Sequence, residues 1–189
     1  LRKKVQQYAR HDSSVLISGE PGSGRGAFAR YIHALSDRAT EPLITLKAAS
    51  LTEGNYEAKL VGSSNGGDAV PGVFERASGG TLIIDELADL GADAQKLLLG
   101  VLEDGTFTRV GSSETVRLQA RILATVRADF EACIEAGSLR RDLVAECSTL
   151  SLRVPPLRDY AEDVPDLLNY YVDKLVESDG LTFRRFSVA

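Results

Sequence analysis

The chain is 189 residues long, carries a net charge of −5 at pH 7 and is 43% apolar. This length and composition fit one globular domain with a hydrophobic core and room for the beginning of a second domain. The acidic balance argues against direct contact with duplex DNA, and no apolar stretch approaches the ~20 residues that cross a bilayer.

Apolar periodicity and turn residues predict an alternation of helices and strands along the chain. In chain order, we predict a helix over 1–10, a strand over 13–18, a helix over 27–35, a strand over 43–46, a loop over 60–71, a strand over 81–84, a helix over 94–102, a hairpin of 106–110 and 115–118, a strand over 121–125, helices over 130–136 and 140–145, a strand over 150–154 and a helix over 163–176. Such an alternation indicates an α/β protein whose parallel sheet is covered by helices on both faces.

Cysteine usage and the start of the chain bear on its cellular setting. Two cysteines, Cys133 and Cys147, fit a reducing compartment without a disulfide framework, so we expect a cytoplasmic protein. The chain starts with Leu-Arg-Lys-Lys, shows no signal peptide and contains no methionine. We therefore expect a fragment of a longer protein.

A glycine-rich segment after the first predicted strand carries the most chemical information. It reads Gly19-Glu20-Pro21-Gly22-Ser23-Gly24-Arg25-Gly26. Glycines allow backbone N–H groups to point at phosphate oxygens, and the start of a helix adds a favourable dipole. The segment predicts a phosphate-binding loop, although a plain glycine turn between a strand and a helix would have the same composition.

Two positions of this loop depart from the standard phosphate-loop motif. Arg25 stands where that motif has a lysine, so the positive charge is kept on a bulkier, forked side chain. Gly26 stands where the motif has the serine or threonine that binds Mg²⁺. We therefore expect impaired chemistry at this loop.

Two carboxylates end the predicted strand over 81–84. In this position Asp85 would hold Mg²⁺, and Glu86 would polarise an attacking water, as at a Walker B strand end. An ordinary acidic strand end is the competing interpretation. The order of the two motifs, each closing a buried strand, favours a nucleotide site.

Several ordered segments resemble the AAA+ domain of sigma-54-dependent transcription activators, the bacterial enhancer-binding ATPases. They are residues 19–24, against that family's GESGTG, and 79–87 around the Walker B strand, together with 32–36, 109–111, 121–124, 154–158 and 162–165. The resemblance implies a three-layer α/β P-loop NTPase fold of AAA+ type, with ATP or ADP and Mg²⁺ as cofactors. It also implies a core over 1–178 and the start of a largely missing helical lid over 179–189.

Besides Arg25, four features depart from this family. Its sigma-gripping GAFTGA loop has no counterpart in residues 62–72, where the segment is shorter. Lys47 replaces an asparagine that contacts the Walker B glutamate; it either pairs with Glu86 or reaches solvent. Arg127 replaces the sensor asparagine and either donates to a phosphate or faces solvent. The last departure concerns two arginines that act on a neighbour's nucleotide, which align with Arg140 and Glu146. Even so, the family itself lacks a hydroxyl at the position of Gly26.

The resemblance and these departures together suggest a regulatory domain of a bacterial transcription regulator that binds ATP or ADP weakly or not at all, hydrolyses ATP slowly if at all and does not contact sigma-54. We expect self-association, an upstream receiver or sensor domain, a downstream DNA-binding domain, no direct nucleic-acid contact from this domain and no membrane contact. One alternative is an active ATPase ring that remodels another target, with Arg25 on phosphate, Asp85 on Mg²⁺, Glu86 as the catalytic carboxylate and Arg140 supplied by a neighbour. Another is an interaction module that binds no nucleotide.

Overall fold

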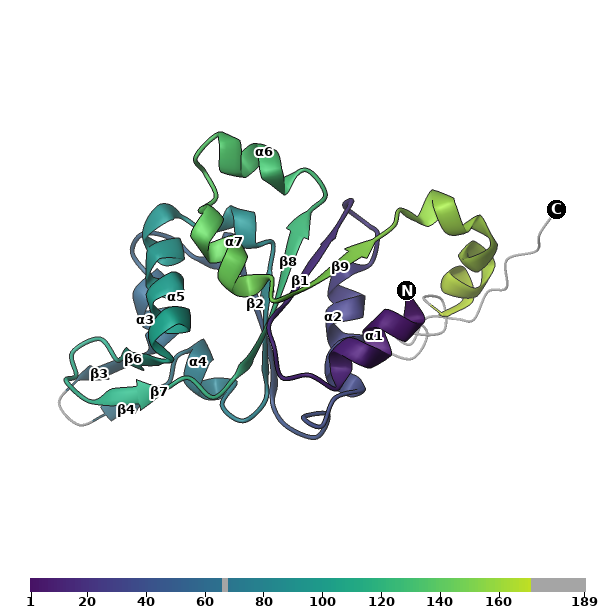
Figure 1. The fold of residues 1–189 in the computed structure, drawn as a ribbon. Helices are drawn as coiled ribbons and strands as arrows, with labels where there is room; N and C mark the ends of the chain where they lie inside the picture. Colours follow the sequence, from purple (N-terminus) through teal and green to yellow (C-terminus); the bar gives the residue numbers. More distant parts are fainter. Residues whose placement is uncertain (66–67, 171–189) are drawn as a thin grey trace, which may run out of the picture. The chain divides into compact units, whose positions relative to one another are not determined.

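A five-stranded parallel sheet forms the centre of the first of two units. The computed structural model describes residues 1–65 and 68–170, which divide into a unit from Leu1 to Val154 and a second unit from Pro155 onward. The strand order is β2-β5-β8-β1-β9 (Figure 1). These strands are β1 (Val15–Gly19), β2 (Leu43–Lys47), β5 (Thr81–Asp85), β8 (Arg121–Arg127) and β9 (Leu150–Val154).

Helices cover both faces of this sheet, which confirms the predicted three-layer α/β arrangement (Figure 1). On one face lie α1 (Arg2–Ala9) and α2 (Arg25–Ala34). On the other lie α3 (Tyr56–Val61), α4 (Val73–Arg76), α5 (Ala92–Asp104) and α7 (Arg141–Cys147). The short helix α6 (Phe130–Glu135) connects β8 to α7 along the chain and has no buried residue.

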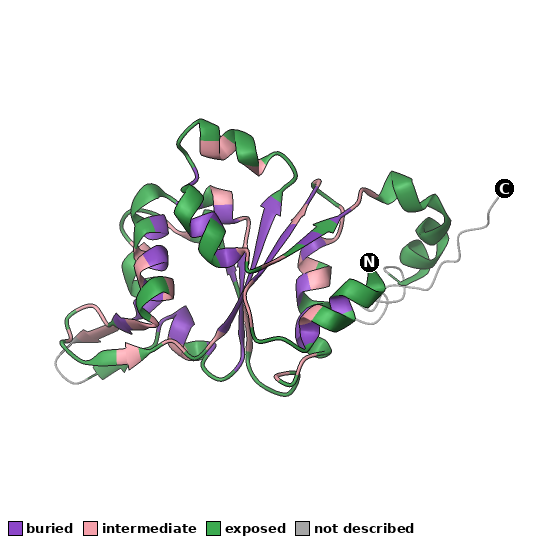
Figure 2. Ribbon diagram, in the orientation of Figure 1, coloured by how far each residue is buried: buried purple, intermediate pink, exposed green. Residues whose placement is uncertain are grey.

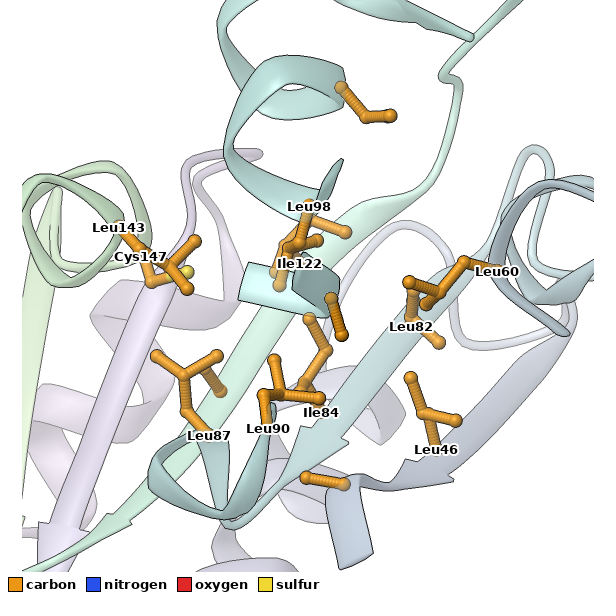
Figure 3. Packing of buried hydrophobic residues seen from close by; sticks show 14 of the residues in the cluster. Leu46, Leu60, Leu82, Ile84, Leu87, Leu90, Leu98, Ile122, Leu143 and Cys147 are labelled. Atoms are coloured by element: carbon orange, nitrogen blue, oxygen red, sulfur yellow. The ribbon is translucent and has the colours of Figure 1, made fainter. Parts of the chain in front are cut away.

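Alternate residues of the central strands enter two different cores, because side chains of a strand point to opposite faces. Ile83 packs with the α1 and α2 residues, whereas Leu82 and Ile84 belong to the larger cluster under α3, α5 and α7. Figure 3 shows this cluster, with Leu98 of α5 and Leu143 of α7 above the sheet. The central strands and the inward sides of the helices are buried (Figure 2), so the strands read as continuous apolar runs.

Arg38, in the turn after α2, binds several groups at the amino-terminal edge of the sheet. Its guanidinium binds both carboxylate oxygens of Asp12 at 2.8 and 2.7 Å. The same side chain donates to the carbonyl oxygens of three residues that precede β5 and β8, namely Gly79, Gly80 and Gln119. One side chain therefore ties together the segments that lead into three strands.

The segment from 60 to 71 differs from the sequence prediction of a loop. Helix α3 continues to Val61, and β3 (Ser63–Asn65) then pairs antiparallel with β4 (Asp68–Val70). Strands of three residues are too short to show an alternating pattern, so the prediction was wrong here. The helices α3 and α4, of six and four residues, were missed for the same reason.

The hairpin of β6 (Thr106–Thr108) and β7 (Thr115–Arg117) confirms the sequence prediction. It lies beside the β3–β4 hairpin, because Val110 donates to the Gly62 carbonyl at 3.0 Å and accepts from the Ser64 amide at 2.8 Å. Gly62 and Gly72 approach closely at the base of β3–β4: a Cβ on Gly72 would lie 2.3 Å from the Gly62 nitrogen. The two hairpins are therefore joined at a crowded base.

The second unit begins with a 3₁₀ segment over Leu157–Asp163, followed by helical residues 164–170. The predicted helix over 163–176 is confirmed to residue 170, and its last part lies outside the described residues. The expected boundary near 179 and the expected lid segment 179–189 also lie outside them. Among the residues that the structure describes, no helix has the length and apolarity that a membrane crossing requires.

Candidate functional site

The candidate site lies at the carboxyl edge of the sheet, where the two sequence motifs meet. The glycine loop joins β1 to α2, and Asp85 ends β5, with β8 paired between these two strands. Carboxyl ends of parallel strands form the usual ligand-binding edge of such sheets. The fold therefore brings together the loop and the carboxylates that the sequence placed 60 residues apart.

Glycine conformations shape the loop. Gly22 and Gly24 have φ angles of 81° and 90°, in the left-handed region that favours glycine. A Cβ on Gly19 would lie 2.7 Å from Ser23 Oγ and 2.8 Å from the Val154 carbonyl oxygen. Gly19 thus lets the loop fold back over the end of β1.

Unused donors of the loop fit an anionic group. Among the described residues, no backbone carbonyl accepts from the amides of Gly22, Gly24, Arg25 or Gly26. Ser23 Oγ is buried and also has no partner there. Amides that open a helix and a buried hydroxyl with unmet hydrogen bonds suit the oxygens of a phosphate group, so the residues present fit a nucleotide.

Arg25 and Glu86 form an ion pair in the middle of the site. Arg25 is 8% exposed, and its two terminal nitrogens donate to the two carboxylate oxygens of Glu86, one of them at 3.3 Å. Glu86 itself has a left-handed backbone, with φ at 60° and ψ at 67°. A non-glycine residue in this conformation is strained, and such strain is common at functional sites. The arginine that replaces the lysine is therefore engaged by the catalytic glutamate of the predicted mechanism.

Burial raises the pKa of Glu86 above its ordinary value, and Arg25 offsets this only in part. The negative charges of Asp85 and Asp89 raise it further. A carboxylate of raised pKa beside an arginine and a second carboxylate is a candidate for proton transfer, so the role of Glu86 stays a prediction.

Thr125 of β8 connects the two carboxylate residues, and sequence reasoning gave it no role of its own. Its hydroxyl donates to Asp85 Oδ1 at 2.8 Å and accepts from the Glu86 amide at 2.9 Å, and the residue is fully buried. The available signal was a hydroxyl within the otherwise apolar run of β8. Thr125 fixes the orientation of the Asp85 carboxylate, the candidate ligand of Mg²⁺.

No group of three or more histidine, cysteine, aspartate or glutamate side chains converges to hold a metal within residues 1–65 and 68–170. A magnesium ion held by one or two carboxylates and by substrate phosphates does not require such a group. That Asp85 is the protein ligand of Mg²⁺ therefore stays a prediction.

Lys47 and Arg127 are both exposed to solvent, which was the simpler of the two interpretations offered for each. Lys47 lies opposite Asp85 in the β2–β5 register but is exposed, and it forms no ion pair with Glu86. The glutamate is engaged by Arg25 instead. Arg127 ends β8, is exposed and lies 3.8 Å from Asp129. Neither side chain contributes to the cluster around the loop.

Arg140 lies apart from this cluster, at the start of α7. Its guanidinium binds the carboxylate of Asp142 at 3.0 and 2.6 Å, and Glu146 is exposed on the same helix. Arg140 is placed by Gln95, a buried residue of α5 that sequence reasoning missed. The Gln95 side chain accepts from the Arg140 amide and donates to the carbonyls of Leu90 and Ser138.

Comparison with known proteins decides the family. The sequence profile of the sigma-54 interaction domain matches residues 1–153. The chain belongs to the sigma-54 interaction domain family. Its fold is accordingly the AAA+ type of P-loop NTPase fold that the sequence suggested.

Relatives of this sigma-54 interaction domain include two bacterial regulators. It is 40% identical over 187 residues to the nitrogen assimilation regulatory protein NtrX of Azorhizobium caulinodans, covering 98% of this chain and 41% of that protein. It is 37% identical over 180 residues to the DNA-binding transcriptional regulator NtrC of Rhizobium meliloti, covering 93% of this chain and 37% of that one. The chain thus spans well under half the length of these relatives.

A crystal structure of NtrX from Brucella abortus in complex with ATP superimposes with a TM-score of 0.88 at 33% identity, covering 98% of this chain and 43% of that chain. The same protein in complex with ADP gives a TM-score of 0.89.

Proposed function

We propose that this sigma-54 interaction domain is the central AAA+ domain of a bacterial transcription regulator and that it binds ATP or ADP weakly and hydrolyses ATP slowly. The observation that carries the proposal is the ion pair of Arg25 and Glu86. The pair engages the single cation of residues 19–26 together with the carboxylate that would polarise water. Such a site suits the relay of a signal better than sustained turnover.

Other residues support slow chemistry. Arg127, which stands where the family has its sensor asparagine, faces solvent beside Asp129. Glu146 places a negative charge where the family has a second arginine. An arginine that reaches the phosphates from a neighbour can contribute several orders of magnitude in rate, so its loss is costly.

The β3–β4 hairpin supports a further part of the proposal, that this domain does not contact sigma-54. Each of its strands has three residues, and residues 62–72 contain no aromatic side chain. The described hairpin thus offers little apolar surface for a partner.

The whole protein is proposed by analogy with its longer relatives. NtrC is named a DNA-binding transcriptional regulator, and the NtrX of Brucella abortus binds ATP and ADP. We propose that a receiver or sensor domain and a DNA-binding domain flank this one in a cytoplasmic regulator, and that this domain self-associates without touching nucleic acid itself.

Calorimetry with ATP or ADP and Mg²⁺, together with phosphate release, tests the proposal. We expect weak binding and a turnover far below the ~1 s⁻¹ at the lower end of ordinary enzymes. Combined substitution of Arg25→Lys, Lys47→Asn and Arg127→Asn is expected to raise turnover. An unchanged rate would contradict the argument for impairment, and no heat with any nucleotide would favour an interaction module.

An active ATPase ring that remodels another target is the second candidate. It is favoured by the intact network of Asp85, Thr125 and Glu86, and by the exposed guanidinium of Arg140, which a neighbouring copy could use. Brisk phosphate release that Glu86→Gln abolishes would establish this candidate and exclude the first.

A further inference from the structure

The guanidinium of Arg25 has two possible anionic partners. Its backbone amide is one of the open donors of the loop, but its side chain is directed at Glu86. Carboxylates and phosphates both bind the paired terminal nitrogens of an arginine. While Glu86 engages both nitrogens, the same fork cannot hold a phosphate group.

Charge around the pair strengthens this conflict. Asp85 and Asp89 are close enough to Glu86 to raise its pKa. When Glu86 neutralises Arg25, the negative charges of Asp85 and Asp89 are no longer offset by that buried cation, since Lys47 and Arg127 at the same edge are exposed to solvent. The loop amides then have to bind phosphate without help from Arg25.

We propose that Glu86 is an internal competitor of the nucleotide: its carboxylate and the nucleotide phosphates exchange on Arg25. Phosphate binding to Arg25 then requires release of the Glu86 carboxylate. The Arg25–Glu86 pair in turn weakens phosphate binding. The inference rests on the proposed function in one respect, since it requires that the loop binds nucleotide. It adds how that binding is regulated and why it is weak.

The backbone around Glu86 allows the exchange without a change in the sheet. The Glu86 amide is held by the Thr125 hydroxyl, so the main chain is anchored on β8. The Glu86 side chain is 27% exposed and pairs with Arg25. Displacement thus needs only a side-chain rotation, after which the carboxylate is available to a water molecule.

The test measures binding of ADP and of inorganic tripolyphosphate to the chain without Mg²⁺, at constant ionic strength. Glu86→Gln removes the competing charge, and we expect both probes to bind at least about tenfold more tightly. The control is Asp89→Asn, which removes one negative charge at the same edge but no contact to Arg25; here we expect a gain below about threefold. Glu86→Gly, which suits the positive φ, serves as a second variant should glutamine disturb folding.

A double-mutant cycle makes the result specific to the pair. In an Arg25→Ala background, Glu86→Gln is expected to gain no more than the Asp89→Asn control. If the unaltered chain binds ADP and neither Glu86 variant binds it more tightly, the competition is refuted while nucleotide binding stands. If no variant binds either probe, the proposed nucleotide binding fails and the competition fails with it.

Discussion

Arg38 and Arg25 lie at opposite edges of one sheet and are bound in opposite ways. Arg38 donates to Asp12 and to three backbone carbonyls, which cannot leave without unravelling the entries to the strands. Arg25 is bound by one glutamate side chain, which can rotate away. An arginine held by main chain stabilises a fold, whereas an arginine held by one side chain remains available for exchange.

The largest expected effect is that of Arg38→Ala on stability. We expect the free energy of unfolding to fall by about 3 kcal/mol, because several charged hydrogen bonds are lost together. Urea denaturation measures it, and ADP binding by the folded fraction should be unchanged. Arg30→Ala, at an exposed position of α2, is the control and should stay within about 0.5 kcal/mol. A loss below about 1 kcal/mol for Arg38→Ala would contradict the comparison.

Arg25→Ala is expected to show the reverse pattern. ADP affinity should fall about tenfold, since the loop loses its single cation, while the unfolding free energy falls by no more than about 2 kcal/mol, because the partly exposed Glu86 can turn to water. Calorimetry and urea denaturation on the same samples measure both quantities. A larger loss of stability than for Arg38→Ala would mean that Arg25 serves the fold rather than the site.

Thr125→Val tests the anchor beneath Glu86. The substitution removes the hydroxyl from between two carboxylate residues at nearly constant volume, and we expect a loss of about 1 kcal/mol in unfolding free energy. Thr125→Ser keeps the hydroxyl and should retain most of the stability. Equal losses for both variants would show that the methyl group, rather than the hydroxyl, matters.

The smallest effects concern pH, and they have opposite signs at the two edges. Arg38 lowers the pKa of Asp12 below its ordinary 3.8, so the stability from this pair is present above that pH and is lost as pH falls through the folded pKa. Burial raises the pKa of Glu86 above 4.5, so the folded state favours its protonated form, and that contribution is lost as pH rises through the raised pKa.

The unfolding free energies of Asp12→Asn and Glu86→Gln, measured across the pH range in which these two carboxyl groups titrate, separate the two contributions. Relative to the unaltered chain, Asp12→Asn should flatten the acid limb, and Glu86→Gln should remove the decline above pH 4.5. Parallel curves for all three proteins would contradict both assignments.

Sequence reasoning located the central strands and both motifs because buried apolar runs and glycine-rich turns are local patterns. It could not find the partner of Arg25. That contact joins residues 61 positions apart and depends on the left-handed backbone of Glu86, which no residue preference predicts. Lys47, rather than Arg25, was considered as the partner of Glu86 from its place in the aligned strand, yet its side chain is exposed at the end of an edge strand. Long-range side-chain geometry, rather than local pattern, decided the site.

The crowded base shared by Gly62 and Gly72 makes the β3–β4 connection a suitable position for grafting. Val110 fixes the base from the neighbouring hairpin, so the register of any longer ribbon is set before its tip begins. Lengthening a connection adds only about 0.6 kcal/mol for each doubling of its residues. Sequences of different length could therefore be exchanged between Asn65 and Asp68 while the scaffold below them keeps its shape.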